Sequence, residues 1–186
     1  MKQQYKSLLK YSAWTAVIVF TILCFINLDT LMNGFLVYDL YEYAGQSISF
    51  TIIVTILYER YLWKYNPLNK NPVLKKYYEG IFISSFDNLQ RTAKLQIKQT
   101  LLSIQIIMIT DESKSSSITA SIDEILNENY LTYCYINTPS SQYRNRSEIH
   151  YGTAILCVED VNNLKGSYYT DRKTRGSIDF RPTTSI

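Results

Sequence analysis

Residues 11–28, YSAWTAVIVFTILCFINL, form an apolar run that contains no charged side chain. A helix of this length can cross the hydrocarbon core of a bilayer. Lysines precede the run, so a cleaved signal peptide is the competing interpretation. However, no small-residue cleavage pattern follows, and the run is longer than the apolar core of such a peptide. We therefore expect a retained membrane span, which constrains the fold more than any other feature of the chain.

A second run, AGQSISFTIIVTILYERYL at residues 44–62, is the weaker candidate span. Glu59 and Arg60 lie near its end, where long charged side chains can extend to the membrane interface. If both runs cross the bilayer, the N-terminal part of the chain is a two-helix transmembrane hairpin with a short connection.

Small and polar residues recur at every fourth position of the second run. They are Ser47, Thr51 and Thr55. Side chains of this kind let helix backbones approach closely and form hydrogen bonds across a helix interface. Two interpretations stay open and are compatible with each other: the two spans of one molecule pack on each other, and the stripe mediates oligomerisation between molecules.

The charges that flank the two runs predict their orientation. Basic residues precede the first run and close or follow the second: Lys2, Lys6, Lys10, Arg60, Lys64, Lys70, Lys75 and Lys76. The connection at residues 29–43 carries acidic residues and no Lys or Arg. By the positive-inside rule, both termini are cytoplasmic and the connection lies outside. We therefore expect a multi-pass membrane protein.

Beyond the second run the pattern changes to short extended segments. Asn66-Pro67 and Asn71-Pro72 indicate a linker, so we divide the chain into an anchor at 1–65, a linker at 66–76 and a cytoplasmic domain at 77–186. Extended segments are expected at 80–87, 94–99, 101–110, 115–122, 131–137, 149–158, 166–171 and 177–181. Residues 122–129 are expected to form a turn or two of helix.

This segment pattern favours a compact all-β domain. About eight short strands with turn-like gaps are typical of a closed antiparallel, lipocalin-like barrel, since closure removes exposed sheet edges. A barrel of that size is filled by side chains or holds one small ligand. The expected fold class is thus a membrane protein with an N-terminal transmembrane hairpin and a C-terminal barrel.

Enzyme signatures are missing from the sequence. There is a single histidine, His150, and no metal-ligand spacing, glycine-rich phosphate loop or nucleophile elbow. We expect no catalytic residue, no metal site and no cofactor. Cys24, Cys134 and Cys157 are odd in number and widely spaced, which favours reduced, buried thiols. The net charge of +3 argues against a nucleic acid polymer as partner.

The stretch GSYYTDRKTRGS, residues 166–177, concentrates basic residues in what reads as a hairpin. Tyr168, Thr170 and Arg172 share one face of the extended chain, and Arg175 follows at the turn. A forked guanidinium binds phosphate oxygens through paired hydrogen bonds. The alternative is a solvated basic turn with Asp171 as its local partner. With the small net charge, an anion site here would suit a small ligand better than a polymer.

Two further stretches carry candidate binding residues. In LTYCYIN, alternation puts Tyr133, Tyr135 and Asn137 on one face. The tyrosines are either barrel core or stacking surfaces for nucleobases, with Asn137 on a base edge. His150 shares its face with the small residue Gly152. It is either a structural histidine or a group beside space that a ligand can fill.

Taken together, the chain resembles the two-transmembrane, β-strand-rich effectors of bacterial CBASS, an anti-phage signalling system based on cyclic oligonucleotides. The resemblance covers essentially the whole chain. It rests on the two N-terminal apolar runs and on the order and spacing of LTYCYINTP, IHYGTAIL and GSYYTDRKTRG.

The resemblance implies a receptor and an effector in one multi-pass chain of the bacterial inner membrane. A partner synthase makes a cyclic dinucleotide, the barrel binds it, and binding drives oligomerisation of the transmembrane helices. Membrane disruption and abortive infection follow. By the same resemblance, Arg172 and Arg175 contact the phosphates with help from Thr170, Tyr133 and Tyr135 flank a base, and Asn137 and His150 give polar specificity.

Three other functions are weighed against this one. A lipocalin-like carrier of an apolar ligand predicts an aliphatic interior without arginine. A scaffold that recruits a protein through a barrel edge predicts no response to nucleotides. A channel is the least favoured, because neither apolar run carries a row of ionisable groups.

Overall fold

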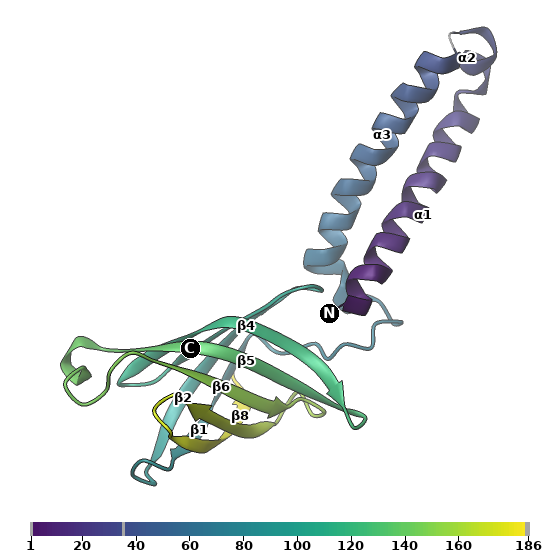
Figure 1. Ribbon diagram of the computed structural model, residues 1–186. Coiled ribbons are helices and arrows are strands. Elements are labelled where there is room, and N and C mark those ends of the chain that lie inside the picture. Colours follow the sequence, from purple (N-terminus) through teal and green to yellow (C-terminus); the bar gives the residue numbers. More distant parts are fainter. Residues whose placement is uncertain (1, 35, 185–186) are drawn as a thin grey trace. The chain divides into compact units, whose positions relative to one another are not determined.

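The computed structural model describes residues 2–34 and 36–184. The chain divides into two compact units, Met1–Asn69 and Lys70–Ile186. The first unit is helical and the second is a β-barrel (Figure 1).

The helical unit is a hairpin of two long helices. Helix α1 covers Lys2–Ile26, the short helix α2 covers Leu28–Asn33, and α3 covers Leu36–Leu57. A π-helical turn, η1 (Tyr58–Leu62), and a 3₁₀ turn, η2 (Trp63–Tyr65), end the unit.

Among the described residues, one helix is long and apolar enough to cross a membrane, Gln4–Ile26. This segment includes most of the first predicted span. Helix α3 begins earlier than the second predicted span, so that its first turns carry Asp39 and Glu42, and its α-helical part ends at Leu57. A second membrane crossing by α3 therefore stays a prediction.

The polar stripe of α3 lies against α1 of the same molecule. The Ser47 hydroxyl donates to the Ala16 carbonyl at 2.6 Å, and the Ser12 and Thr55 hydroxyls are 2.8 Å apart. Ser47 and Thr51 are buried. The structure therefore shows the first of the two interpretations, packing of the two helices on each other.

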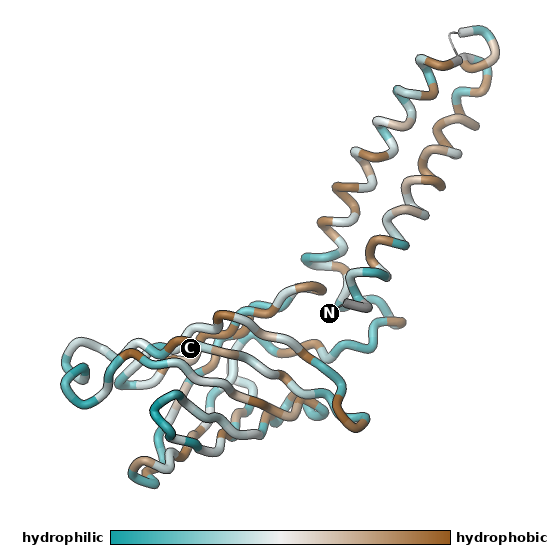
Figure 2. Tube along the Cα trace, viewed as in Figure 1, coloured by the Kyte–Doolittle hydropathy of each residue, from teal (hydrophilic) through white to brown (hydrophobic). Residues whose placement is uncertain are grey.

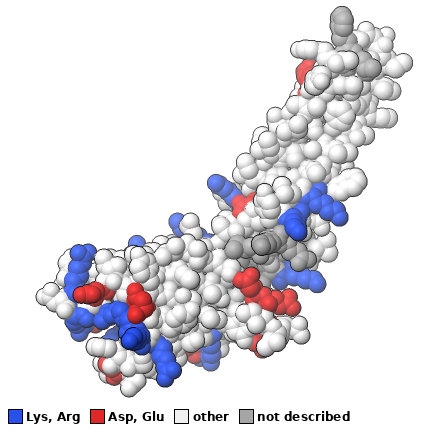
Figure 3. All heavy atoms as spheres, in the orientation of Figure 1, with Lys and Arg blue, Asp and Glu red and all other residues white. Residues whose placement is uncertain are grey.

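The apolar side chains of the hairpin mostly point away from the α1–α3 contact. Phe25 is 78% exposed and Ile53 is 58% exposed. Brown, hydrophobic positions recur along both helices in Figure 2, and most of the hairpin surface in Figure 3 is free of charged residues on the face in view. A hairpin with an apolar outer surface and a polar seam suits a lipid environment better than water.

The second unit is a closed barrel of eight antiparallel strands, each paired with its neighbours in chain order and the last with the first. The strands are β1 (Tyr77–Ser84), β2 (Gln90–Gln99), β3 (Ile104–Ile109), β4 (Ser113–Ile125), β5 (Glu128–Pro139), β6 (His150–Cys157), β7 (Leu164–Thr170) and β8 (Arg175–Pro182). This confirms the predicted barrel, and each expected extended segment overlaps one strand.

The helical turns expected at residues 122–129 are wrong. Ile125 pairs with Glu128, so β4 and β5 are joined by a two-residue turn at Leu126 and Asn127. Both turn residues have positive φ, 53° and 65°. Two-residue turns with this backbone match the right-handed twist of the strands, so the chain reverses as a hairpin.

Side chains fill one end of the barrel. Buried residues from six strands pack there: Tyr78, Leu95, Ile106, Leu131, Leu156 and Phe180. The Tyr78 hydroxyl closes this end by donating to the Val161 carbonyl at 2.9 Å and accepting from the Lys75 amide at 2.9 Å. The interior space that remains lies toward the opposite end.

The expectation that all three cysteines are buried is wrong for Cys134, which is exposed, whereas Cys24 and Cys157 are half-buried. The inward positions of β5 are taken by Leu131, Tyr133 and Tyr135. Cys134 alternates with them and therefore faces outward.

Candidate functional site

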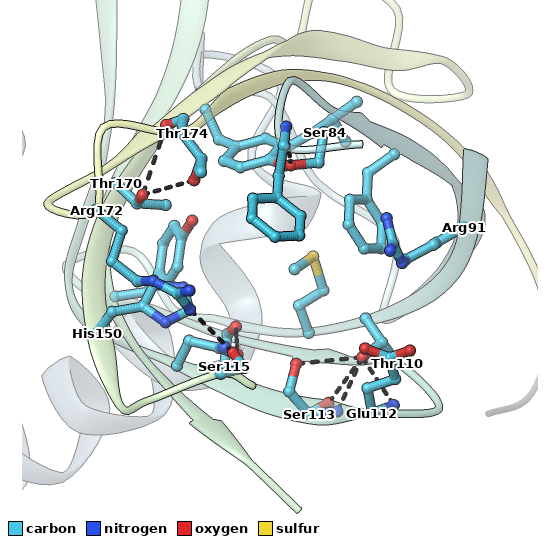
Figure 4. Close-up of a pocket in the computed structure, with 18 of the residues that line it drawn as sticks. Ser84, Arg91, Thr110, Glu112, Ser113, Ser115, His150, Thr170, Arg172 and Thr174 are labelled. Atoms are coloured by element: carbon cyan, nitrogen blue, oxygen red, sulfur yellow. Dashed lines mark hydrogen bonds between the residues drawn. The ribbon is translucent and has the colours of Figure 1, made fainter. Parts of the chain in front are cut away.

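A cavity of about 350 Å³ lies at the end of the barrel opposite the packed core. It is surrounded by the turns that join β1 to β2, β3 to β4, β5 to β6 and β7 to β8 (Figure 4). The volume falls in the range that small-molecule sites occupy. The barrel therefore has one filled end and one end open to a ligand.

Two tyrosines of β5 form the floor of this cavity. Tyr133 is 2% exposed and Tyr135 is 5% exposed, and their ring centroids are 5.8 Å apart. A Cβ at Gly152 would lie 2.4 Å from the Tyr135 ring, so the glycine makes room for that tyrosine. Burial raises the pKa of both phenols, which keeps their hydroxyls protonated. The tyrosines are thus both core and cavity lining.

A polar row crosses three strands beside the tyrosines. Strand register aligns Ser115 of β4 with Asn137 of β5, and Asn137 with His150 of β6. The Ser115 hydroxyl donates to the Asn137 side-chain oxygen at 2.8 Å. His150 Nδ1 lies 2.9 Å from the Glu148 carbonyl oxygen. All three residues of the row line the cavity.

Three arginines line the cavity, and two of them have acidic partners. Arg91 forms an ion pair with Asp87, and Arg146 forms one with Glu112. The Arg91 guanidinium lowers the pKa of Asp87 to about 2. Arg172 instead donates from Nη1 to the Ser147 hydroxyl at 3.0 Å. Within the described residues it has no carboxylate partner, so its charge is available to an anion.

The proposed local partner of the basic turn, Asp171, makes a different contact. Its carboxylate accepts from the Tyr151 amide at 3.2 Å. Tyr168 and Thr170, from the same hairpin, line the cavity, and the Thr170 hydroxyl lies 2.7 Å from that of Thr174. The structure therefore does not show Asp171 as the counter-ion of Arg172.

Arg175 is the one predicted binding residue that the structure does not bring to the cavity. It is exposed and pairs in the β7–β8 ladder with Tyr169, whose side chain is also exposed. Successive residues of a strand face opposite sides. Because Tyr168 and Thr170 face inward, Tyr169 and its partner Arg175 face outward. The other seven predicted residues line the cavity together.

Sequence reasoning missed several lining residues. The missed polar residues that form ion pairs or hydrogen bonds with other lining residues are Asp87, Arg91, Glu112, Ser115 and Arg146. Alternation along a strand shows which residues share a face, but it does not show which strand ends meet. Arg146 belongs to the β5–β6 connection, where no periodic pattern applies.

A metal centre has no support in the part of the chain that the structure describes. No group of three or more His, Cys, Asp or Glu side chains there could hold an ion. The chemistry of the site is instead that of neutral hydroxyls, an amide, an imidazole and guanidinium groups around a small cavity.

Comparison with known proteins identifies this domain. Residues 70–182 match the family model described as "Cap15, cyclic dinucleotide receptor domain". The chain is also 30% identical over 182 residues to CD-NTase-associated protein 15 of Staphylococcus schleiferi, an alignment that covers 96% of this chain and 97% of that protein. The barrel with its cavity is therefore a cyclic dinucleotide receptor domain, and the chain belongs to the Cap15 family of CBASS effectors.

Proposed function

We propose that the barrel cavity binds a cyclic dinucleotide made by a partner synthase, and that binding drives oligomerisation of the transmembrane helices, membrane disruption and abortive infection. One observation carries the ligand part. Arg172 lines a cavity of ligand size in the receptor domain and, among the described residues, has no carboxylate partner. Phosphate is the group that an available guanidinium at such a site binds best.

The remaining cavity residues complete the site. Tyr133, Tyr135 and Tyr168 supply aromatic surfaces for the bases. Thr170 supports the phosphate contact, while Asn137 and His150 contact polar edges of the ligand. Phosphate also competes for the paired arginines, because an incoming anion can replace the carboxylates of Asp87 and Glu112 as their partner.

The helical unit supports membrane anchoring. Gln4–Ile26 has the length and composition of a span, and the exposed side chains of the α1–α3 hairpin are largely apolar. We propose that α3 crosses as well, which puts both termini and the barrel in the cytoplasm and the acidic connection between the two apolar runs outside. The uneven distribution of Lys and Arg sets this orientation.

Two spans are too few to line a pore within one molecule, so membrane damage requires assembly. In a single molecule, Ser47 and Thr55 already contact α1. Self-association through the Ser47, Thr51 and Thr55 stripe therefore requires helices to exchange partners between molecules. The ligand favours this exchange only if it binds the assembled state more tightly than the single molecule.

The cavity does not suit an apolar cargo. A lipocalin-like carrier predicts an interior without arginine, whereas Arg91, Arg146 and Arg172 all line this space. A desolvated guanidinium without an anionic partner is costly.

The test is thermal unfolding of the full chain in detergent with a panel of cyclic dinucleotides. A bound ligand stabilises the folded state by about 2.7 kcal/mol at a hundredfold excess over its Kd. A raised midpoint with one member of the panel supports the proposal, and the same ligand should then release dye from proteoliposomes. If no member raises the midpoint of a well-folded sample, the receptor proposal is wrong for this cavity.

A further inference from the structure

The row Ser115–Asn137–His150 presents two hydrogen-bonding groups to the cavity, a donor from Asn137 and an acceptor from His150. The Asn137 side-chain oxygen is taken by the Ser115 hydroxyl at 2.8 Å. The amide nitrogen of Asn137, which has no partner among the described residues, is left for the ligand. Because both Ser115 and Asn137 are buried, at 3% and 7% exposure, water cannot easily replace the serine. The amide nitrogen donates, so Asn137 is a donor position.

The histidine presents the opposite character. Its Nδ1 lies 2.9 Å from the Glu148 carbonyl oxygen, and a carbonyl oxygen can only accept. Nδ1 therefore carries the hydrogen. In the neutral ring the second nitrogen, Nε2, then has a free lone pair. It has no partner in the described part of the chain, and His150 lines the cavity, so His150 is an acceptor position.

The two positions are adjacent. Asn137 and His150 are directly opposite each other in the β5–β6 ladder, where side chains on one face are neighbours. Figure 4 shows Ser115, His150 and Arg172 on the same side of the cavity. A base held there meets a donor beside an acceptor, while Arg172 is placed to hold the sugar–phosphate ring.

Nucleobases differ in the order of these groups on their pairing edge. Guanine and uracil carry an oxygen acceptor at the position where adenine and cytosine carry an amino donor. The adjacent ring nitrogen is a donor in the first pair and an acceptor in the second. Once the phosphates fix which way the base faces, only one of the two orders can match the Asn137–His150 pair.

We infer that this row discriminates keto bases from amino bases in the ligand, with Ser115 as the positioning residue that holds the Asn137 amide. This inference rests on the proposed binding of a cyclic dinucleotide in the cavity. The Ser115 hydroxyl can also accept a hydrogen bond, but turning the amide over would leave the hydrogen of this buried hydroxyl without an acceptor among the described residues. Without the Ser115 hydroxyl this cost disappears, and the amide can present its oxygen instead. The site then accepts either order.

The experiment compares ligands that differ in one base and share one linkage. The full chain in detergent is titrated calorimetrically with cyclic GMP–AMP against cyclic di-AMP, and with cyclic UMP–AMP against cyclic CMP–AMP. Two correctly matched hydrogen bonds should separate the members of at least one pair by about tenfold or more. The quantity compared between variants is this ratio of Kd values.

Four variants distinguish a positioning role of Ser115 from a purely structural role. Ser115→Ala should bring the ratio close to one with little change in the unfolding midpoint, and Ser115→Thr, which keeps a hydroxyl, should restore it. Asn137→Asp, which replaces the donor by an acceptor, should move the ratio toward the other member of the pair. Ser116→Ala is the matched control, because Ser116 is the next residue of β4 and does not line the cavity.

The outcomes separate this inference from the proposed function. If no cyclic dinucleotide binds, both are wrong; if wild-type protein binds another cyclic dinucleotide but none of these four ligands, the receptor function stands and this inference is wrong. If it binds them but separates neither pair by tenfold, or if Ser115→Ala weakens both members equally, the receptor function stands and the discrimination by this row is wrong.

Discussion

Arg172 differs from the other cavity arginines in its partner. Arg91 and Arg146 are neutralised by carboxylates, whereas Arg172 contacts the Ser147 hydroxyl. The strand pattern singled out Arg172 together with Arg175, because both belong to one basic hairpin. Arg172 lies in the β7–β8 turn and lines the cavity, whereas Arg175 faces outward at the start of β8, which makes Arg175 a control for charge.

Arg172→Gln should weaken binding of the cyclic dinucleotide by about tenfold to a hundredfold, since a hydrogen bond to a charged group is worth about 1.5–3 kcal/mol. Arg175→Gln, which removes the same charge from the outer face, should bind as wild type does. Calorimetric titration of both variants measures the difference. Equal losses in the two variants would mean that only overall charge matters, and unfolding of Arg172→Gln alone would indicate a structural role.

Gly152 controls the cavity floor through Tyr135. A Cβ there would lie 2.4 Å from the Tyr135 ring and 2.9 Å from the Tyr169 carbonyl oxygen. Gly152→Ala should therefore lower the free energy of unfolding by about 1–3 kcal/mol and displace the ring. Gly45→Ala, where nothing lies within 4 Å of the added carbon, is the control. Denaturant unfolding measures both; equal stability of the two variants would contradict this account.

Among the structural elements, the β1–β2 turn joins the cavity to the stability of the barrel. Asp87 and Arg91 flank this turn and form an ion pair with each other. The Asp87 carboxylate also accepts a hydrogen bond from the Leu89 amide at 3.1 Å, which holds the turn in place. The hydrogen bonds from Arg91 are the largest cause of the lowered pKa of Asp87, which is about 2.

Stability should depend on this pair in acid. The pKa of Asp87 is lower in the folded state than the ordinary 3.8, so the stabilisation is present above about pH 4 and is lost as the pH falls toward 2. The unfolding midpoints of wild type and Asp87→Asn should differ at pH 5 and converge at pH 2. Asp111→Asn, at an exposed position of the β3–β4 turn, is the control. A difference that is constant over this range would contradict the role of the pair.

The helical hairpin is a second element for which the sequence left two interpretations open. Ser47, Thr51 and Thr55 recur at a helical spacing that suits either a partner helix of the same chain or one of another molecule. In the structure the Ser47 and Thr55 hydroxyls bond to α1. The Thr51 hydroxyl is buried and has no partner among the described residues.

For the molecule as a whole, the proposed topology has a direct test. In intact cells, a membrane-impermeant maleimide should label Asn33→Cys, in the connection between the long helices, and should not label the native Cys134 on the exposed outer face of the barrel. After permeabilisation both should react. Labelling of Cys134 in intact cells would place the barrel outside and exclude contact with a cytoplasmic messenger.

The sequence alone determined the order of the units and the type of each. An uncharged run of span length allows few structures, and alternating segments between turn residues require strands, because periods of 2 and 3.6 are local properties of the chain. The hairpin at Leu126 and Asn127 was missed because neither the helical nor the strand reading of residues 122–129 is strong in the sequence. Strand pairing decided it.

Tertiary structure decided which side chains meet. The motifs located Tyr133, Tyr135, Asn137, His150, Tyr168 and Thr170, because each lies on a recognisable face of its own strand. They also located Arg172, in the turn that follows β7. Ser115, Arg91 and Arg146 come together with them only through barrel closure and register, which bring strand ends far apart in sequence around one cavity. The sequence determines which side chains of a strand share a face, because the alternation is local. Only closure of the barrel determines which of these side chains meet in one cavity and which charges there form ion pairs.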